Sequence, residues 1–282
     1  MLHGSDLEKR NLDLIGLDVG FSTTRRTTGV ARLVNGQLSL GRATSLWESR
    51  TEILGCHGET EVAAIDAPIL SELHWEARSC ERLLTFGTFQ RRCKPGLSHV
   101  RGTGRQLRKA GFDAGNQIAP VCSDANGKIQ FPRVWAGTNI VEAFPNAFLG
   151  VVVPVTRYEI MPHLRRGKKF DWLYDQWLEI DAFGEFTNEL DPSGALLREC
   201  QNCATHEERA ALVCVLAAGG VALERYTAIG DKNGGYFLLP QLNKWAPWAR
   251  QELEKQRGRF ENLEIWVNGE LIRDSQSLPK SS

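Results

Sequence analysis

The chain has 282 residues, 42% hydrophobic and 24% charged, values that are typical of an ordinary globular protein. Its 34 Lys and Arg residues equal its 34 Asp and Glu residues, so the net charge gives no sign of a wholesale nucleic-acid binder, and such binding would need a local patch. No apolar run approaches the ~20 residues of a membrane span, and the seven scattered cysteines argue against a disulfide framework.

We predict one domain at residues 12–275, with an N-terminal tail at 1–11 and a disordered tail at 276–282. The first ten residues are polar and lack the apolar core of a secretory signal. A cytoplasmic protein without a membrane partner is therefore expected. The sequence does not indicate whether the protein is a monomer or an oligomer.

The first predicted strand, at residues 12–19, carries Asp18 near its end. Its near-continuous apolar run is typical of a strand covered on both faces, and Gly20 follows where the backbone must turn. A buried Asp costs desolvation energy unless a cation or a hydrogen-bond donor meets it. The amides of its own turn could equally satisfy Asp18. Arg25 and Arg26, in the loop that follows, are candidate phosphate contacts.

Residues 28–34 and 37–43 predict two strands joined by a tight hairpin at Asn35-Gly36. A helix is expected at 46–54. The next strand, at 61–66, repeats the first design, because it ends in Asp66 and a proline follows at position 68. Two strands that each end in an Asp favour a shared carboxylate site.

A helix is predicted at 74–84, and a basic insertion follows at about 85–135. Its first part, 85–120, reads as irregular, with a short helix at 106–111. No acidic residue lies between positions 91 and 109, and a long cationic loop of this kind is typical of a binding segment. A solvated loop that pairs with acidic neighbours is the alternative. The candidate substrate-binding residues in it are Arg91, Arg92, Lys94, His99, Arg101 and Arg105.

A further strand at 139–145 is the third that carries an acid near its end, Glu142. Later in the chain, Thr205 and Glu208 have the spacing of a capping box, in which the two residues satisfy the first amides of a helix. The helix that they would begin is apolar on all sides at 210–218, so it should be buried. Strands at 226–230 and 234–239 and an outer helix at 242–254 complete the pattern.

This element order is that of a ribonuclease H-like fold, an α/β fold with a mixed five-stranded sheet (three antiparallel strands, then parallel strands) flanked by helices. Five short segments also resemble the DUF429 family of predicted ribonuclease H-like nucleases, and the resemblance runs from about residue 12 to 240. These segments are Ile15-Gly16-Leu17-Asp18, Ile65-Asp66-Ala67-Pro68, Arg78-Ser79-Cys80-Glu81, Val141-Glu142-Ala143-Phe144-Pro145 and Ala210-Ala211-Leu212-Val213-Cys214.

The resemblance implies a metal-dependent nuclease that hydrolyses phosphodiester bonds of DNA or RNA with two Mg²⁺ or Mn²⁺ ions. Carboxylates are suitable ligands for such hard cations. The implied catalytic and metal-binding residues are Asp18, Asp66, Glu142, Glu207 and Glu208. The family commonly has an Asp where this chain has Ala210, so Glu207 or Glu208 would have to reach the site from one turn earlier, while the other caps the helix.

Three other interpretations remain open. The stretch from Asp18 to Thr24 also resembles the phosphate loop of actin- and hexokinase-like kinases, although no second such loop is found. Cys200, Cys203 and His206 have the close spacing of zinc ligands, without an obvious fourth. Finally, the departure at Ala210 suits a non-catalytic nucleic-acid-binding protein on a degenerate ribonuclease H-like scaffold.

Overall fold

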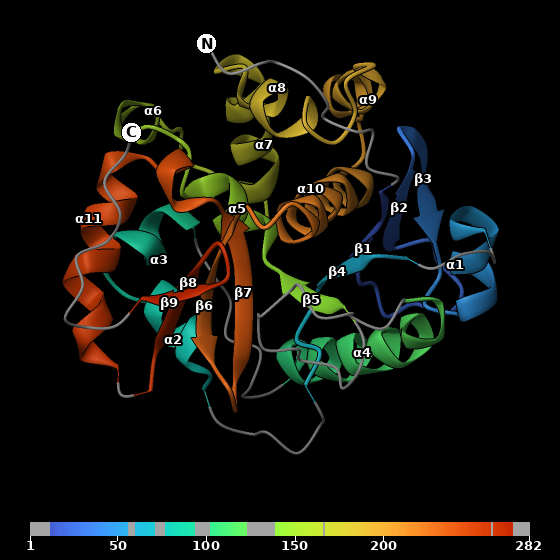
Figure 1. The fold of residues 1–282 in the computed structure, drawn as a ribbon, viewed down its shortest axis with the longest axis horizontal. Helices are drawn as coiled ribbons and strands as arrows, with labels where there is room; N and C mark the ends of the chain where they lie inside the picture. The colour runs from blue at the N-terminus through green and yellow to red at the C-terminus, as the bar shows by residue number, and fades with distance from the viewer. Residues whose placement is uncertain are drawn as a thin grey trace, which may run out of the picture.

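The computed structural model describes residues 12–55, 60–70, 77–93, 102–122, 139–165, 167–260 and 262–272. It is an α/β structure in which helices flank a mixed sheet of nine strands (Figure 1). The strands are β1 (Asp13–Asp18), β2 (Thr28–Val34), β3 (Gln37–Ala43), β4 (Val62–Asp66), β5 (Ile140–Ala143), β6 (Tyr226–Asp231), β7 (Gly235–Pro240), β8 (Glu264–Val267) and β9 (Glu270–Ile272).

The strand order across the sheet is β3-β2-β1-β4-β5-β7-β6-β8-β9. Strands β1, β2 and β3 form an antiparallel meander, and β1, β4, β5 and β7 are parallel neighbours in turn. The expectation of five strands is therefore corrected, because β7 pairs with β5 and continues the sheet through β6, β8 and β9. The sequence signal for the last pair is the turn at Asn268 and Gly269, both with positive φ.

The helices cover both faces of the sheet. They are α1 (Trp47–Leu54), α2 (Ser79–Leu84), α3 (Gly87–Cys93), α4 (Thr103–Ile118), α5 (Pro145–Gly150), α6 (Val155–Glu159), α7 (Lys169–Glu179), α8 (Ala182–Thr187), α9 (Ala195–Asn202), α10 (His206–Ala222) and α11 (Pro247–Gln256), with short 3-10 turns η1 (Ala119–Val121), η2 (Leu242–Lys244) and η3 (Arg257–Arg259). None of the helices in the described residues is long and apolar enough to cross a membrane.

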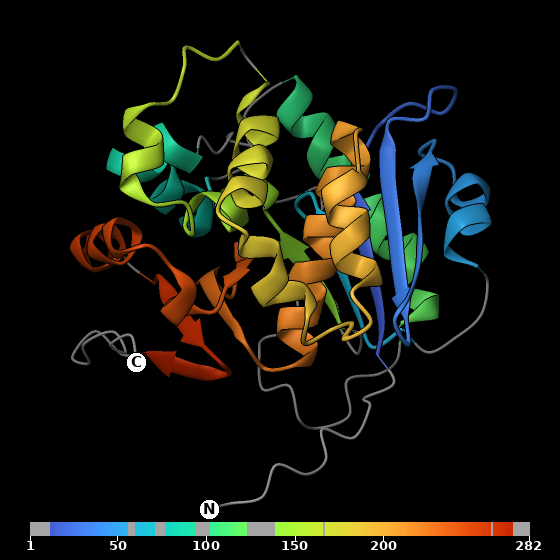
Figure 2. The ribbon, with the colours of Figure 1, turned by 90° about the horizontal axis from the view of Figure 1, so that it is seen from above.

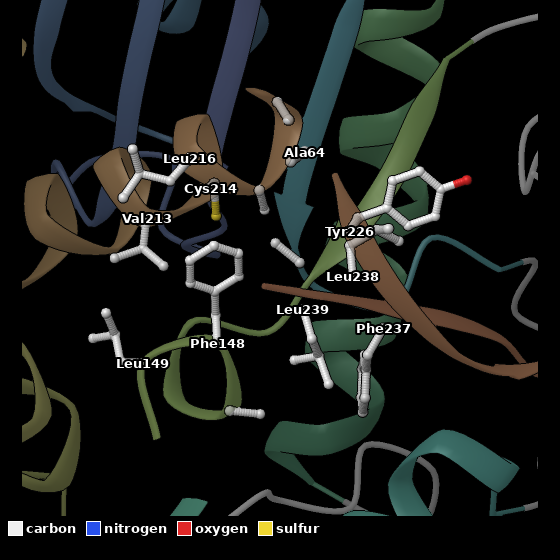
Figure 3. Packing of buried hydrophobic residues seen from close by; sticks show 14 of the residues in the cluster. Ala64, Phe148, Leu149, Val213, Cys214, Leu216, Tyr226, Phe237, Leu238 and Leu239 are labelled. Carbon is white, nitrogen blue, oxygen red and sulfur yellow. The ribbon is translucent and has the colours of Figure 1, made fainter. Parts of the chain in front are cut away.

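Two apolar cores lie on opposite faces of the central strands. On one face α10 crosses β1, β2 and β4, and Figure 2 shows the helices from α7 to α10 packed together over it. Figure 3 shows part of this core, where Phe148 and Leu149 of α5 lie with Val213 and Cys214 of α10. On the other face α4 packs on β4 and buries Ala114 and Ile118 (Figure 1).

The hairpin at 28–43, the helix at 46–54 and the buried helix that begins after Thr205 are confirmed to within a residue or two. The expectation of an irregular segment with one short helix at 106–111 is wrong, because α3 and the 16-residue α4 form there. Helix α4 tolerates its glycines since one of them, Gly111, lies against the Pro68 carbonyl, where a Cβ would not fit. The predicted tails, 1–11 and 276–282, lie outside the described residues.

Candidate active site

The two strand-end aspartates lie side by side. Asp18 is the last residue of β1, Asp66 is the last residue of β4, and the two are register partners in the parallel pairing. Register partners on adjacent strands direct their side chains to the same face, with backbones about 4.8 Å apart. Both residues are partly exposed. Within the described ranges, no hydrogen bond or ion pair reaches either carboxylate.

Burial and repulsion make this acid pair costly to ionise. Burial, followed by the charges of Asp66 and Glu207, raises the pKa of Asp18 well above its usual value. Burial and the charge of Glu142 raise the pKa of Asp66 to about 7. Poorly hydrated like charges are stabilised by protons or by a cation. The pair therefore has the electrostatic character of a cation site.

Glycines bring the start of α10 against the strand that ends in Asp18. A Cβ on Gly29, the β2 partner of Asp18, would collide with the Glu207 carbonyl, and one on Gly16 would collide with the Ala211 carbonyl. Only glycine permits this close approach of helix and sheet. As a result Glu207 lies close enough for its charge to raise the pKa of Asp18.

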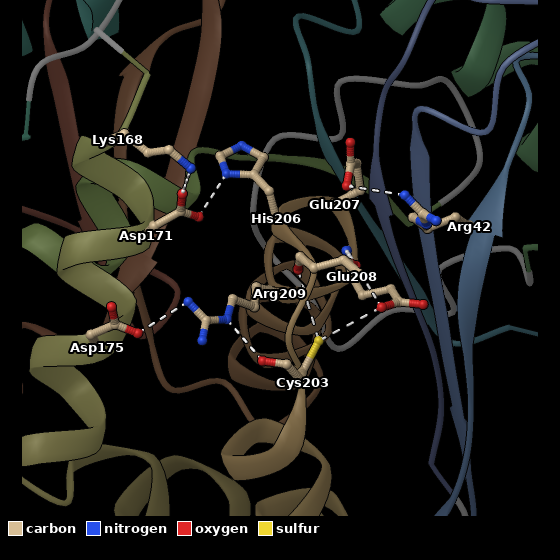
Figure 4. Close-up of polar contacts among 10 residues, drawn as sticks. Arg42, Lys168, Asp171, Asp175, Cys203, His206, Glu207, Glu208 and Arg209 are labelled. Carbon is tan, nitrogen blue, oxygen red and sulfur yellow. Dashed lines mark hydrogen bonds and ion pairs between the residues drawn. The ribbon is translucent and has the colours of Figure 1, made fainter. Parts of the chain in front are cut away.

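Glu207 and Glu208 have different environments. Thr205 caps α10 by accepting a hydrogen bond from the Glu208 amide at 3.4 Å, and its hydroxyl donates to the Glu208 carboxylate at 2.5 Å. Glu207 instead lies 4.0 Å from Arg42 of β3, and Figure 4 shows the two glutamates directed to different neighbours. Glu208 therefore belongs to the helix cap, and Glu207, which lies near Arg42, is the one whose charge acts on Asp18. Ala210 is buried and brings no ligand.

Glu142 lies on the other face of the sheet. Its register partner is Ile65, and it shares a face with Ile140, both of which belong to the core under α4. Arg78 donates to both of its carboxylate oxygens, at 2.6 and 2.8 Å. Burial raises the pKa of Glu142 to about 7 although Arg78 acts in the opposite direction. Its charge still acts on Asp66.

The basic residues predicted to bind substrate divide into separate groups. Arg25 and Arg26 are exposed in the loop after β1, and Arg105 is exposed on α4. Arg91 and Arg92 lie on α3, which packs against α5 and α11, and the Arg92 guanidinium stacks over Trp248 with its carbon 4.4 Å from the ring centre. Lys94, His99 and Arg101 lie outside the described residues.

The three candidate zinc ligands face different partners. Cys200 is buried, and Cys203 makes weak contacts to the Thr205 carbonyl and to Glu208. His206 is bonded to Asp171 at 2.9 Å, as Figure 4 shows. Among the residues that the structure describes, no group of three or more His, Cys, Asp or Glu side chains is arranged to hold a metal ion. This applies to the zinc candidates and to the acidic residues alike.

A pocket of about 520 Å³ opens between α4 and the loops that follow β1 and β3. Phe21, three residues after Asp18, lies at its wall and is 42% exposed. Arg50, Lys109 and Gln117 supply cationic and amide groups to the lining. The pocket is therefore polar and aromatic, and it lies next to the strand that carries Asp18.

Two arginines near Glu142 are buried. No role was predicted for Arg78, whereas Arg108 lies in the cationic stretch between positions 91 and 109 that was predicted to bind substrate. Arg78 holds Glu142 and, at 3.0 Å, Glu81. Arg108 of α4 lies near the same acids. Both cations stood in the sequence within recognised segments, but their burial depends on the helix packing, which the sequence pattern does not give.

No protein-family model, curated protein or solved structure matches this chain.

Proposed function

We propose that the chain is a metal-dependent nuclease with a ribonuclease H-like core. The unpaired carboxylates of Asp18 and Asp66, at adjacent strand ends, are the observation that carries the proposal. The order β3-β2-β1-β4-β5, with a meander followed by parallel strands, supports the fold assignment. The resemblance of the strand-end segments to DUF429 proteins points in the same direction.

The donor set suits Mg²⁺ or Mn²⁺. Mg²⁺ in proteins is commonly held by one or two carboxylates together with waters and substrate phosphates, so Asp18 and Asp66 suffice for one such ion. Glu207, whose charge acts on Asp18, is the further acid that could serve a second ion. Bound there, the cation would activate water and stabilise the leaving oxygen. Glu142 is committed to Arg78 on the other face and is better assigned to supporting β5 than to ligation.

Nucleic acid is the substrate that the surrounding residues suit best. Arg25 and Arg26 lie in the loop that follows the strand end with Asp18. From there they can bind the phosphates on either side of the reacting phosphate. The pocket beside Phe21 has an exposed ring on which a base could stack. Such contacts would make binding weaken steeply as salt rises.

A second candidate function is nucleic-acid binding without cleavage. It is favoured by Ala210 at the position where the resembled family commonly has Asp. The lack of a three-ligand group among the described residues favours it as well. The two candidates predict the same salt-sensitive binding and differ only in turnover.

We expect purified protein to cleave single-stranded DNA or RNA when Mn²⁺ or Mg²⁺ is added. Substrates labelled at the 5′ end, resolved on denaturing gels, give the rate, and EDTA should abolish it because the two carboxylates alone do not activate water. Binding measured in parallel by fluorescence anisotropy separates the two candidates. Salt-sensitive binding without cleavage in either metal would select the binding protein, and cleavage that persists in EDTA would refute the metal-dependent mechanism.

A further inference from the structure

Arg108 of α4 is buried without a hydrogen-bond partner. The residue is 4% exposed, and all three of its guanidinium nitrogens are inaccessible and have no hydrogen-bond partner among the residues that the structure describes. A buried guanidinium is costly unless an acceptor meets it, and such groups are normally paired. We therefore interpret this unsatisfied buried cation as the partner of an anionic ligand.

The acids around Arg108 are already engaged. The charged and titratable groups that act on it are Arg78, Glu81, Glu142 and Cys80. Both oxygens of Glu142 accept hydrogen bonds from Arg78, which also donates to Glu81. Burial and the charge of Arg78 lower the pKa of Arg108, while the two glutamates oppose the shift. Arg108 thus adds a positive charge beside a salt-bridged cluster.

Helix packing places Arg108 at the carboxyl end of β4. Gly111, three residues further along α4, lies against the backbone of Pro68, which is two residues beyond Asp66. Glu142 pairs in register with Ile65, the residue before Asp66, so Glu142 also lies at this end of the sheet, on the face that α4 covers. An anion at the rim of the sheet, beyond the last residue of β4, would have Arg108 on the α4 side and the acid pair, with its cation, on the α10 side.

We propose that Arg108 binds a phosphate group of the substrate at this end of the sheet. The proposal rests on the proposed nuclease function and names a positioning residue for it. A guanidinium presents parallel N–H donors that match the oxygens of a phosphate, and it cannot lose its charge at neutral pH. The non-bridging oxygens of the phosphate accept the hydrogen bonds of Arg108, which orients the phosphorus toward Asp18 and Asp66.

The test is a titration with inorganic phosphate in EDTA at low ionic strength, followed by calorimetry and by thermal shift. We expect the wild type to bind phosphate and Arg108→Gln to bind it at least about tenfold more weakly, the effect of a lost charge-assisted hydrogen bond. Arg108→Lys keeps the charge but loses the parallel N–H donors of the guanidinium, so an intermediate phosphate affinity is expected. This variant replaces Arg108→Gln in the titration if the Gln variant does not fold. Arg198→Gln, an exposed arginine of α9, is the matched control and should bind like the wild type.

Equal phosphate affinity in the wild type and in Arg108→Gln, or no binding by the wild type, would overturn the proposal. In that case Arg108 would pair with Glu81 after a side-chain rotation and would be structural only. Because the titration contains EDTA, its result does not depend on the cation. Phosphate binding through Arg108 without any cleavage would contradict the nuclease function alone, and cleavage with unchanged phosphate binding in Arg108→Gln would contradict the role of Arg108 alone.

Discussion

Asp18→Asn is expected to reduce metal-dependent cleavage by a factor of the order of a thousand and to make the protein more stable. Loss of one electrostatic group at the reacting centre commonly costs that much in rate. The gain in stability has a separate cause, since burial and neighbouring acids disfavour the ionised carboxylate of Asp18. A neutral amide of the same shape removes that penalty, an example of a site that is stabilised when its function is lost.

Single-turnover cleavage rates in Mn²⁺ and urea unfolding in EDTA, both at pH 8, measure the two effects. Asp191→Asn is the matched control. Asp191 is buried, but its carboxylate accepts hydrogen bonds from the Ser193 hydroxyl and from the Leu196 and Ser193 amides, which outweigh burial and lower its pKa. We therefore expect Asp191→Asn to lower the free energy of unfolding and to leave cleavage unchanged. A destabilised Asp18→Asn, or one that cleaves at the wild-type rate, would contradict the account.

Asp66 should make the metal-free protein less stable as the pH rises from about 4 to about 7. Its pKa is about 7 in the folded protein and about 3.9 in an unfolded chain. Between these values the folded state holds a proton that the unfolded state has lost, so stability falls by up to about 1.4 kcal/mol per pH unit. The stability is greatest at pH values below the pKa of Asp66 in the unfolded chain, and it becomes constant above the pKa of Asp66 in the folded protein.

Asp66→Asn should flatten this dependence and raise the free energy of unfolding at pH 8 by about 2 kcal/mol, less than the full linkage value because Asp66 is partly exposed. Asp18 and Glu142 shift in the same direction, so a smaller slope should remain. Urea unfolding at pH 5, 6, 7 and 8 in EDTA measures the pH dependence of the free energy of unfolding in the wild type and in the variant. The interpretation of Asp66 would be wrong if the variant kept the wild-type slope.

The strand ends at Asp18 and Asp66 could be predicted because a buried strand has a continuous apolar run, and an acid that interrupts it is visible in the sequence. The sequence alone does not divide the roles of Glu207 and Glu208, since both lie in the first turn of α10. The packing of Gly29 against the Glu207 backbone brings the charge of Glu207 to bear on Asp18. The sequence also does not predict on which face of the sheet Glu142 lies, because that depends on the register of β5 with β4.

The binding residues were harder to predict than the acids. A cationic segment predicts affinity for phosphate, but the burial of Arg108 depends on how α4 lies on the sheet. The short strands β8 and β9 have 4 and 3 residues, which is too few for a clear alternation of apolar and polar positions. Local patterns thus gave the carboxylates, and tertiary packing added the cations around them.

We propose that Asp18 and Asp66 together bind a divalent cation. A titration with Mn²⁺, in which electron paramagnetic resonance measures the free ion, tests it without any assumption about the substrate. We expect saturable Mn²⁺ binding by the wild type and by Asp191→Asn, and loss of that binding in both Asp18→Asn and Asp66→Asn. Mn²⁺ binding that is absent from the wild type, or that survives both substitutions, would contradict it.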